Sequence, residues 1–273
     1  MSLEAEARAE SGVTTRIKYV VAGEKSIFVP TDRAKSYWPV DEHEVRIESM
    51  RPIADKLAID KNGFVLVKEP TTVEDFYKPG AIKKVYYAEI ERLVKRLTGA
   101  EKVLVWGEMI RSDRPQTADG SLPAYGAHVD YGDRTVREKS REMLGAEADN
   151  WLNRRFFLMN LWRPIKTVEK SPLAVVDAST VLQSDLNDSE VRGGLGDPNR
   201  PPLYGFNLQY SPRHRWYYAP RMQPDEILVF KLFDSDPARV QLTGHTAFDD
   251  PTSAKDAPPR ESIEVRTISF MPQ

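Results

Sequence analysis

Short apolar runs separated by proline- and glycine-containing turns recur along most of the chain. Residues 156–162, 227–233 and 262–270 are clear examples, and they are rich in β-branched and aromatic side chains. Many short strands with turn signals between them favour a sandwich or barrel over alternating β-α units. The expected fold is mainly β with flanking helices, and a double-stranded β-helix (a cupin-like jelly roll) is the preferred form.

The same pattern of apolar and polar positions predicts the remaining helices and strands. Two stretches have helical character: residues 82–97, with a helical apolar spacing that ends at Gly99, and the charged residues 136–152. Further strands are expected at residues 16–21, 26–29, 63–67, 103–106, 125–131, 173–177, 205–210, 215–218 and 245–248. No repeat or linker divides the chain. Residues 1–273 are expected to form one domain, in which α/β elements of residues 1–100 pack on a jelly-roll core of residues 101–273.

Composition narrows the classes of function. A net charge of −2 argues against nucleic acid or a polybasic membrane surface as a partner. The chain has no cysteine, which excludes disulfides, thiolate nucleophiles and cysteine-ligated metals. No apolar run is long enough to span a membrane, and the acidic, polar N-terminus does not look like a signal peptide. A cytoplasmic location is therefore expected.

Four histidines limit the choice of metal ligands. His43 lies in an acidic, solvated-looking stretch and His214 lies between arginines, so His128 and His245 are the favoured pair. On a strand, His128 and Asp130 point the same way, because side chains alternate with period 2. Together with His245 they would form a two-histidine, one-carboxylate face that leaves three positions of an octahedral metal open.

A basic residue and a hydroxyl follow the second histidine. His245 is expected to open one strand and Arg260 the next, antiparallel to it, so that Arg260 and Ser262 share a face. A guanidinium grips a carboxylate with two hydrogen bonds, and a hydroxyl adds a third. This pair suits the distal end of a dicarboxylate. Arg266 is a rival for that role, and Ser262 favours Arg260.

Longer motifs support a family resemblance. The stretches that carry it are residues 160–164, 214–218, 225–226 with Lys231, 234–235, 245–251 and 259–266. With these motifs the chain resembles the non-haem Fe(II)/2-oxoglutarate-dependent oxygenases. More narrowly, it is similar to the branch with a fungal gibberellin desaturase, a cephamycin methoxylation protein and a fungal meroterpenoid endoperoxidase. The resemblance is firm over residues 100–273 and loose before them.

The resemblance implies Fe(II), 2-oxoglutarate as co-substrate, and O₂. Iron would be held by His128, Asp130 and His245, and 2-oxoglutarate by Arg260 and Ser262. Decarboxylation of 2-oxoglutarate at iron would give an Fe(IV)-oxo species that hydroxylates, desaturates or otherwise oxidises a small molecule, with no catalytic residues beyond the ligands. Secondary metabolites are the substrate class that the resemblance implies.

Four side chains are candidates for the pocket, and each also has a plainer interpretation. The candidates are Asn160, Trp162, Arg111 and Trp216. Trp162 and Trp216 would equally suit core packing, and Arg111 would equally suit solvent. Neither the substrate nor the oligomeric state, a homodimer included, follows from the sequence.

Two other functions compete with the oxygenase. The first is a non-haem iron oxidase or dioxygenase on the same barrel that does not use 2-oxoglutarate, and so has no need of Arg260. The second is a ligand-binding jelly roll without catalysis, which the intact set of His128, Asp130 and His245 argues against.

Overall fold

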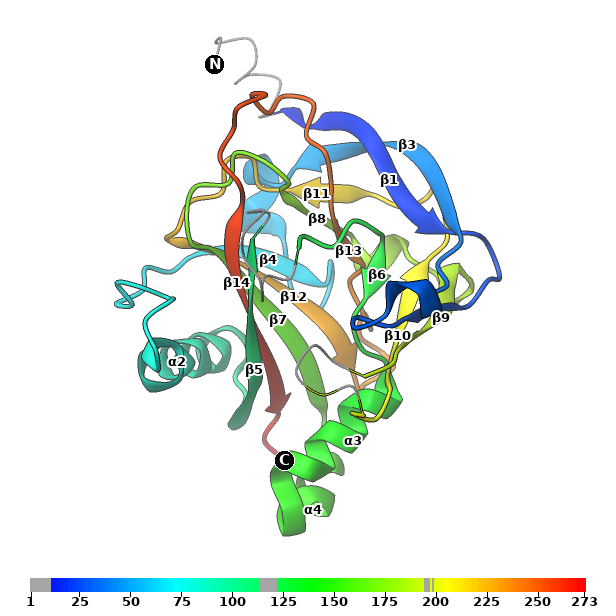
Figure 1. Ribbon diagram of the computed structural model, residues 1–273. Helices are drawn as coiled ribbons and strands as arrows, with labels where there is room; N and C mark the ends of the chain where they lie inside the picture. The colour runs from blue at the N-terminus through cyan, green and yellow to red at the C-terminus, as the bar shows by residue number, and fades with distance from the viewer. Residues whose placement is uncertain (1–10, 113–121, 194–196, 198) are drawn as a thin grey trace.

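Two facing β-sheets make up most of the molecule, which we describe from a computed structural model covering residues 11–112, 122–193, 197 and 199–273 (Figure 1). The larger sheet has nine strands in the order β1-β3-β11-β8-β13-β6-β10-β9-β2, and the smaller has five in the order β4-β12-β7-β14-β5. Nearly all the pairings are antiparallel. This confirms the mainly β jelly-roll fold that the sequence predicts.

The elements have the following bounds. The larger sheet contains β1 (Val13–Val20), β2 (Ser26–Phe28), β3 (Val40–Ser49), β6 (His128–Val129), β8 (Leu173–Val176), β9 (Leu186–Val191), β10 (Leu203–Leu208), β11 (Trp216–Tyr218) and β13 (His245–Ala247). The smaller contains β4 (Phe64–Lys68), β5 (Lys102–Ser112), β7 (Phe156–Pro164), β12 (Glu226–Asp234) and β14 (Glu261–Phe270). The helices are α2 (Tyr87–Thr98), α3 (Asp133–Leu144) and α4 (Ala148–Leu152), with short turns η1 (Arg33–Lys35), η2 (Arg51–Lys56), η3 (Ile82–Tyr86), η4 (Gly145–Glu147), η5 (Ala178–Thr180) and η6 (Gln183–Asp185).

Both faces of the smaller sheet carry buried apolar side chains. Its inner face, which includes Trp162 and Phe230, joins the core between the sheets. Its outer face, which includes Leu161 and Val265, packs in a second cluster with Leu93 of α2. Helix α2 lies on the side of this sheet that faces away from the larger sheet (Figure 1). Because side chains alternate along a strand, this division decides which residues of β7 and β14 can reach the site.

The two expected helices differ in how well they match. The first is confirmed: η3 forms a single π-helical turn, and α2 continues to Gly99, which ends it with a left-handed φ of 74°. The second, expected as one helix over residues 136–152, is wrong in its continuity. It is broken at Gly145, where φ is 55°, into α3 and α4.

Two strands escaped the sequence interpretation. In β3, which pairs with β1 over its length, only Ile47 and Ser49 are buried, so the polar run that contains His43 looked like solvated chain. Strand β9 has the polar sequence Leu-Asn-Asp-Ser-Glu-Val and pairs with β10. Polar strands near a sheet edge lack the apolar pattern on which such predictions depend.

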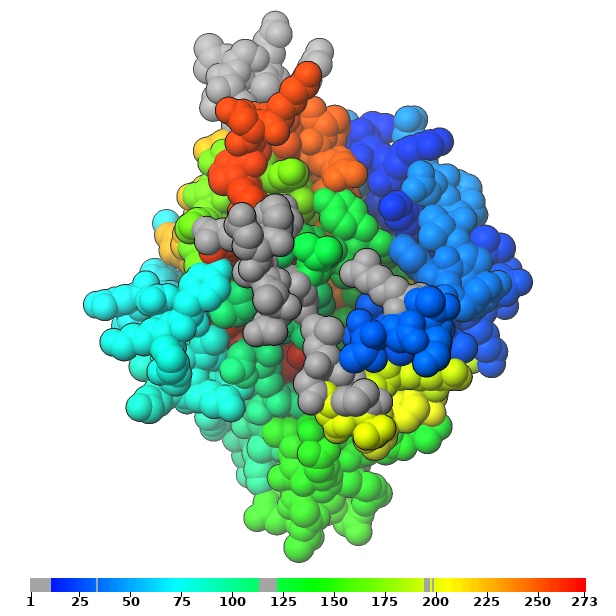
Figure 2. Space-filling view, viewed as in Figure 1, coloured from blue at the N-terminus to red at the C-terminus, as the bar shows by residue number. Residues whose placement is uncertain are grey.

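Strands of the first hundred residues belong to both sheets. Strand β3 pairs in parallel with β11, and β4 pairs with β12. In the space-filling view, the blue segment around residues 25–40 lies against the yellow segment around residues 200–210 (Figure 2). The single domain expected for residues 1–273, with its division near residue 100, stays a prediction. Across the described residues, no helix is long and apolar enough to cross a membrane.

Part of the shared motif pattern serves the fold. Lys231, which is fully buried, donates hydrogen bonds of 2.6 Å to both Asp60 and Asp234. Arg155 contacts the same two carboxylates at 2.8 and 2.7 Å. Removing one member of such a buried ion cluster typically costs about 3–5 kcal/mol. Lys231 and Asp234 therefore stabilise the outer side of the smaller sheet.

Candidate metal centre

His128, Asp130 and His245 converge. One ligand atom from each lies within 4.8 Å of the other two. Nε2 of His128 is 3.4 Å from Oδ1 of Asp130, and Nε2 of His245 is 3.6 Å from Oδ2. The histidines meet because β13 pairs with β6 and places them opposite each other, with ring centroids 4.3 Å apart. The three residues that the sequence singled out thus form one cluster.

Asp130 reaches the cluster differently from the expectation. The strand expected over residues 125–131 is only two residues long, so Asp130 follows β6 and is not paired by strand alternation. The chain passes very close to Gly205, where an added Cβ would lie 2.5 Å from the Asp130 carbonyl oxygen. A glycine is needed at this contact. The Asp130 carboxylate is in turn fixed from the opposite sheet, since Asn160 Nδ2 donates to Oδ2 at 2.9 Å.

Backbone carbonyls orient both imidazoles. His128 Nδ1 lies 2.7 Å from the Gly126 carbonyl oxygen, and His245 Nδ1 lies 3.5 Å from that of Thr243. A carbonyl oxygen accepts a proton and cannot donate one, so in each neutral ring Nδ1 carries the hydrogen. The lone pair of Nε2 then points to the cluster, as it does in histidines that ligate metals.

The charges of the site favour ionised Asp130 and neutral His245. Burial alone would raise the pKa of Asp130, but its hydrogen bond with His128 and the nearby histidine charges outweigh burial and hold it well below its usual range. Burial lowers the pKa of His245 to about 3, helped by the neighbouring His128. Burial alone would lower the pKa of His128, but the hydrogen bond with Asp130 and the charge of that carboxylate outweigh burial and raise the pKa.

The donor set fits a divalent first-row metal ion. Two ligands at right angles, each about 2.1 Å from a metal, lie about 3 Å apart. The 3.4 Å separation between His128 Nε2 and Asp130 Oδ1 is slightly larger, so a small side-chain movement would close these two ligands on an ion. Two imidazoles and one carboxylate leave three positions of an octahedral ion open.

Arg260 and Ser262 lie on the inner face of the smaller sheet, and one expectation about them is wrong. The strand that Arg260 precedes, β14, belongs to the smaller sheet, whereas His245 lies in the larger, so the two strands are not neighbours. Arg260 is 2% exposed, and its guanidinium donates to the Ser171 carbonyl oxygen at 2.6 Å. Ser262 Oγ is buried and has no hydrogen-bond partner among the described residues. Such a hydroxyl is available to a ligand.

Arg266, the rival arginine, is already engaged. Its guanidinium donates to Glu264 Oε1 at 2.7 Å, and both side chains are largely buried. It is paired across the sheet with Asn160, the residue that contacts Asp130, so it lies close to the metal ligands. Arg111 pairs with Ser262 on the same face and is half-buried.

The aromatic candidates separate by face. Trp162 lies under the Arg260 guanidinium on the inner face, and it is 2% exposed. Tyr217 and His245 both pair with Val175 and therefore share the inner face. Trp216 points to the opposite face, where its indole nitrogen donates to the Tyr19 hydroxyl at 2.8 Å. Tyr217 thus takes the inward position among the three aromatic residues of β11.

The contacts that position the ligands had no sequence signal. The Gly126 and Thr243 acceptors are backbone atoms, which every residue has. Trp38 packs so closely on Gly126 that an added Cβ would lie 2.3 Å from its ring. Trp38 and Gly126 are far apart in the chain, so only the folded structure reveals this contact.

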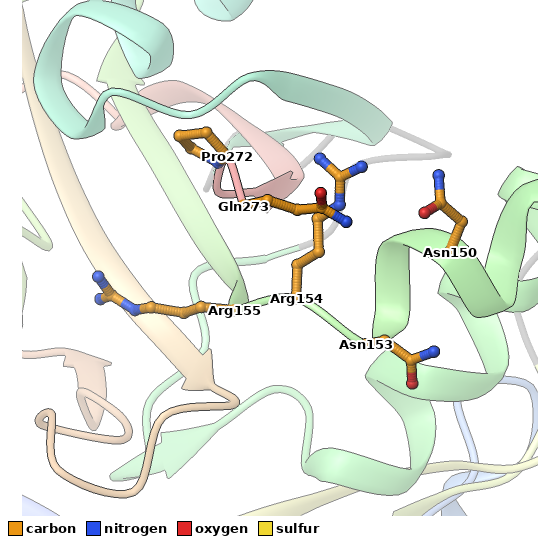
Figure 3. A pocket seen from close by; sticks show the side chains of 6 residues that line it. All are labelled: Asn150, Asn153, Arg154, Arg155, Pro272 and Gln273. Atoms are coloured by element: carbon orange, nitrogen blue, oxygen red, sulfur yellow. The ribbon is translucent and has the colours of Figure 1, made fainter.

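A separate hollow lies at the far end of the smaller sheet. It has a volume of about 370 Å³ and is lined by Asn150, Asn153, Arg154, Arg155, Pro272 and Gln273. Figure 3 shows Arg154 reaching toward Gln273, with the two asparagines on the helical segment beside it. Arg154 is also bound to Glu101 at 2.9 Å. None of the lining residues belongs to the metal-ligand cluster.

Two histidines and one carboxylate on the inner face of a jelly roll define a site of the non-haem iron oxygenase type. Comparisons with known proteins agree. A family model described as an oxidoreductase/YMDC permease-like domain matches residues 16–270. An Fe(II)/2-oxoglutarate-dependent dioxygenase of Aspergillus novofumigatus is 32% identical over 240 residues, which cover 84% of this chain and 83% of that protein.

Two further relatives extend the agreement. A gibberellin cluster desaturase of Gibberella fujikuroi is 26% identical over 307 residues, covering 84% of this chain and 87% of the desaturase. The solved structure of an iron and alpha-ketoglutarate-dependent endoperoxidase, NvfI, matches with a TM-score of 0.86 and 28% identity, over 96% of this chain and 99% of that one. The chain belongs to the Fe(II)/2-oxoglutarate-dependent dioxygenases of this oxidoreductase family.

Proposed function

We propose that His128, Asp130 and His245 hold the Fe(II) on which this dioxygenase depends, and that Arg260 and Ser262 bind the distal carboxylate of 2-oxoglutarate. The convergence of the three ligand atoms within 4.8 Å carries the first assignment. The Fe(II) bound there would supply the site where O₂ and 2-oxoglutarate react. Every other contribution comes from side chains that orient the reactants and exclude water.

Position along the strands favours Arg260 over Arg266 for the distal carboxylate. Asn160 marks the level of the metal ligands, because it contacts Asp130. Arg266 is paired with Asn160 at that same level, where the metal-chelating end of the co-substrate belongs. Arg260 lies over Trp162, two residues, or about 7 Å, farther along β7. A five-carbon diacid extends in that direction from the metal.

The Arg260 side chain suits this role chemically. A buried guanidinium binds a carboxylate through two parallel hydrogen bonds and neutralises its charge away from water. The buried Ser262 hydroxyl, with no partner in the described structure, supplies a further donor. Trp162 beneath the guanidinium holds its plane in place and keeps water from the site.

The substrate is a small molecule, and we propose an apolar secondary metabolite that carries an oxygen function. The relatives named above include a desaturase and an endoperoxidase, and a further relative from Hormonema carpetanum is named a hydroxylase/desaturase, so hydroxylation, desaturation and peroxidation are all candidate reactions. Arg111, half-buried on the inner face, offers a positive charge to an oxygen or carboxylate of that substrate. A cytoplasmic location is kept as part of this proposal.

Anaerobic titration tests the assignment. Fe(II) and then 2-oxoglutarate are added to the metal-free protein, and the visible spectrum is followed. A weak charge-transfer band that requires both additions is expected. Protein that binds Fe(II) but gives no band with 2-oxoglutarate would favour the oxidase that does not use this co-substrate, and Arg260→Ala would then leave turnover unchanged.

A further inference from the structure

The amide of Asn160 contacts a metal ligand from the opposite sheet. Asn160 lies on β7 in the smaller sheet, and Asp130 follows β6 in the larger. Nδ2 of Asn160 donates to Oδ2 of Asp130 at 2.9 Å. Asn160 is fully buried, so water cannot replace this hydrogen bond.

The chemistry of the pair fixes the orientation of the amide. A carboxylate that binds a metal is deprotonated, so Asp130 in its proposed role only accepts hydrogen bonds. An amide oxygen at 2.9 Å from it would be repelled, so the nitrogen must face Asp130. The Asn160 oxygen then points elsewhere, and it has no hydrogen-bond partner among the described residues.

The backbone holds Asn160 at this place. It is paired on one side with Phe230 of β12 and on the other with Arg266 of β14. Phe230 in turn packs on the ring of His245, with centroids 4.8 Å apart. Asn160 therefore lies at the centre of the smaller sheet, directly across from the ligands, and its side chain has little freedom to move.

The hydrogen bond bears on how many oxygens of Asp130 bind a metal, because the Asn160 amide occupies one lone pair of Oδ2 and makes that oxygen the poorer ligand. A free carboxylate can bind through both oxygens and would then occupy two positions of an octahedral ion. With two histidines, this would leave two positions open, which a chelating 2-oxoglutarate would fill completely. O₂ would then have no open position on the ion. A carboxylate with one oxygen engaged elsewhere leaves three.

We propose that Asn160 is a positioning residue that keeps Asp130 a one-oxygen metal ligand and so preserves the third open position. This inference rests on the proposed role of the three ligands. Oδ1 of Asp130, which lies 3.4 Å from Nε2 of His128, is the oxygen left for the metal.

The test compares Asn160→Leu and Asn160→Ala with a matched control. Leucine keeps the branching and the number of side-chain heavy atoms of asparagine and removes the donor, while alanine removes the side chain beyond Cβ. The control is Asn62→Leu, because Asn62 Nδ2 donates to Oδ2 of Asp177, a buried carboxylate outside the metal cluster, at 3.0 Å. Circular dichroism and thermal melting of the metal-free proteins establish that each variant folds.

Two measurements are made on the folded variants, neither of which needs turnover. Mn(II) affinity, read from the electron paramagnetic resonance of free Mn(II), should fall about 10- to 100-fold in both Asn160 variants and stay unchanged in the control. Nitric oxide is then added to the anaerobic Fe(II) and 2-oxoglutarate complex as a probe of the third position. The spin-3/2 signal per iron should fall by more than half in the Asn160 variants.

The outcomes separate cleanly. Wild-type Mn(II) affinity and nitric oxide signal in the Asn160 variants would overturn the proposal, and so would weaker metal binding with an unchanged signal. A crystal structure of the Mn(II)-loaded wild type provides a check that needs no variant: Asp130 bound through both oxygens would overturn it as well. If the wild type gives no 2-oxoglutarate-dependent band, the proposed function fails, while the Mn(II) affinities still report on Asn160.

Discussion

The guanidinium of Arg260 lies over the indole of Trp162, 5.4 Å from the ring centroid. The ring restricts the cation to one plane, and the Ser171 carbonyl oxygen fixes one of its nitrogens at 2.6 Å. The cation is thus oriented before any ligand arrives, which lowers the entropic cost of binding one.

Replacing Arg260 by alanine is expected to weaken 2-oxoglutarate binding about 10- to 100-fold, because hydrogen bonds to charged groups contribute about 1.5–3 kcal/mol. Arg260→Lys should fall between the wild type and alanine, since a point charge remains but the two-pronged geometry is lost. Titrating the visible band with 2-oxoglutarate measures this, and Mn(II) affinity serves as the control. If Arg266→Met, and not Arg260→Ala, weakens the binding of 2-oxoglutarate, then Arg266 and not Arg260 binds its distal carboxylate.

Removing any one metal ligand should abolish tight metal binding. His128→Ala, Asp130→Ala and His245→Ala are each expected to lose more than about 100-fold in Mn(II) affinity, because even residues that only support ligands cost 10–100-fold. His43→Ala is the control, since His43 lies on β3 and stacks on Tyr210 with centroids 3.7 Å apart. Calorimetric titration gives the affinities. A ligand variant that binds Mn(II) as the wild type does would remove that residue from the metal centre.

The buried His214 should make the fold less stable in mild acid. Burial lowers its pKa from 6.5, and Asp185 only partly opposes this. Above pH 6.5 the imidazole is neutral in both states and contributes nothing. As the pH falls below 6.5, the unfolded chain binds a proton that the folded protein refuses, and the free energy of unfolding decreases by at most about 1.4 kcal/mol per pH unit.

Urea unfolding of the wild type and His214→Gln at pH 7.5, 6.5 and 5.5 isolates this contribution from that of the carboxylates. The difference in unfolding free energy between the two proteins should change more between pH 6.5 and 5.5 than between 7.5 and 6.5. Parallel curves over the whole range would mean that His214 titrates alike in both states.

Gly126 is expected to tolerate no side chain while Trp38 is present. An added Cβ would lie 2.3 Å from the Trp38 ring, so Gly126→Ala should cost about 1–3 kcal/mol of stability and weaken metal binding through the carbonyl that orients His128. Trp38→Ala in the same chain should restore part of both, because the φ of 158° at Gly126 strains a side chain even without the ring. Gly107→Ala is the control, because an added Cβ there meets nothing within 4 Å. Additive effects of the two substitutions in urea unfolding would contradict the clash.

The sequence singles out the three residues that cluster in the structure, because their chemistry is carried by rare residue types in a short motif. His128 and Asp130 are two residues apart, and only three other histidines compete for the third position. The family motifs then add Arg260 and Ser262. The strand expected over residues 125–131 was nevertheless too long, since β6 ends at Val129 and Asp130 lies just beyond it.

What the sequence could not predict depends on register between distant strands. Which of Trp216 and Tyr217 faces the site follows from their pairing with β8, a one-residue matter that no local pattern reveals. The placement of Arg260 in a different sheet from His245 has the same origin. The contact between Asn160 of β7 and Asp130, which follows β6 of the other sheet, joins residues far apart in the chain, so no local sequence pattern predicts it.

The division of the site between the sheets has a mechanical consequence. The larger sheet carries both histidines, and Arg260 borders the smaller. A diacid that chelates the iron and binds Arg260 at its far end would then connect the two sheets for as long as it is bound. Iron alone binds histidines of one sheet, whereas iron and the diacid together connect both sheets. Their combined increase in melting temperature should therefore exceed the sum of the separate increases. The enzyme is therefore expected to be most rigid when iron and co-substrate are both bound, and to become less rigid each time the co-substrate is consumed.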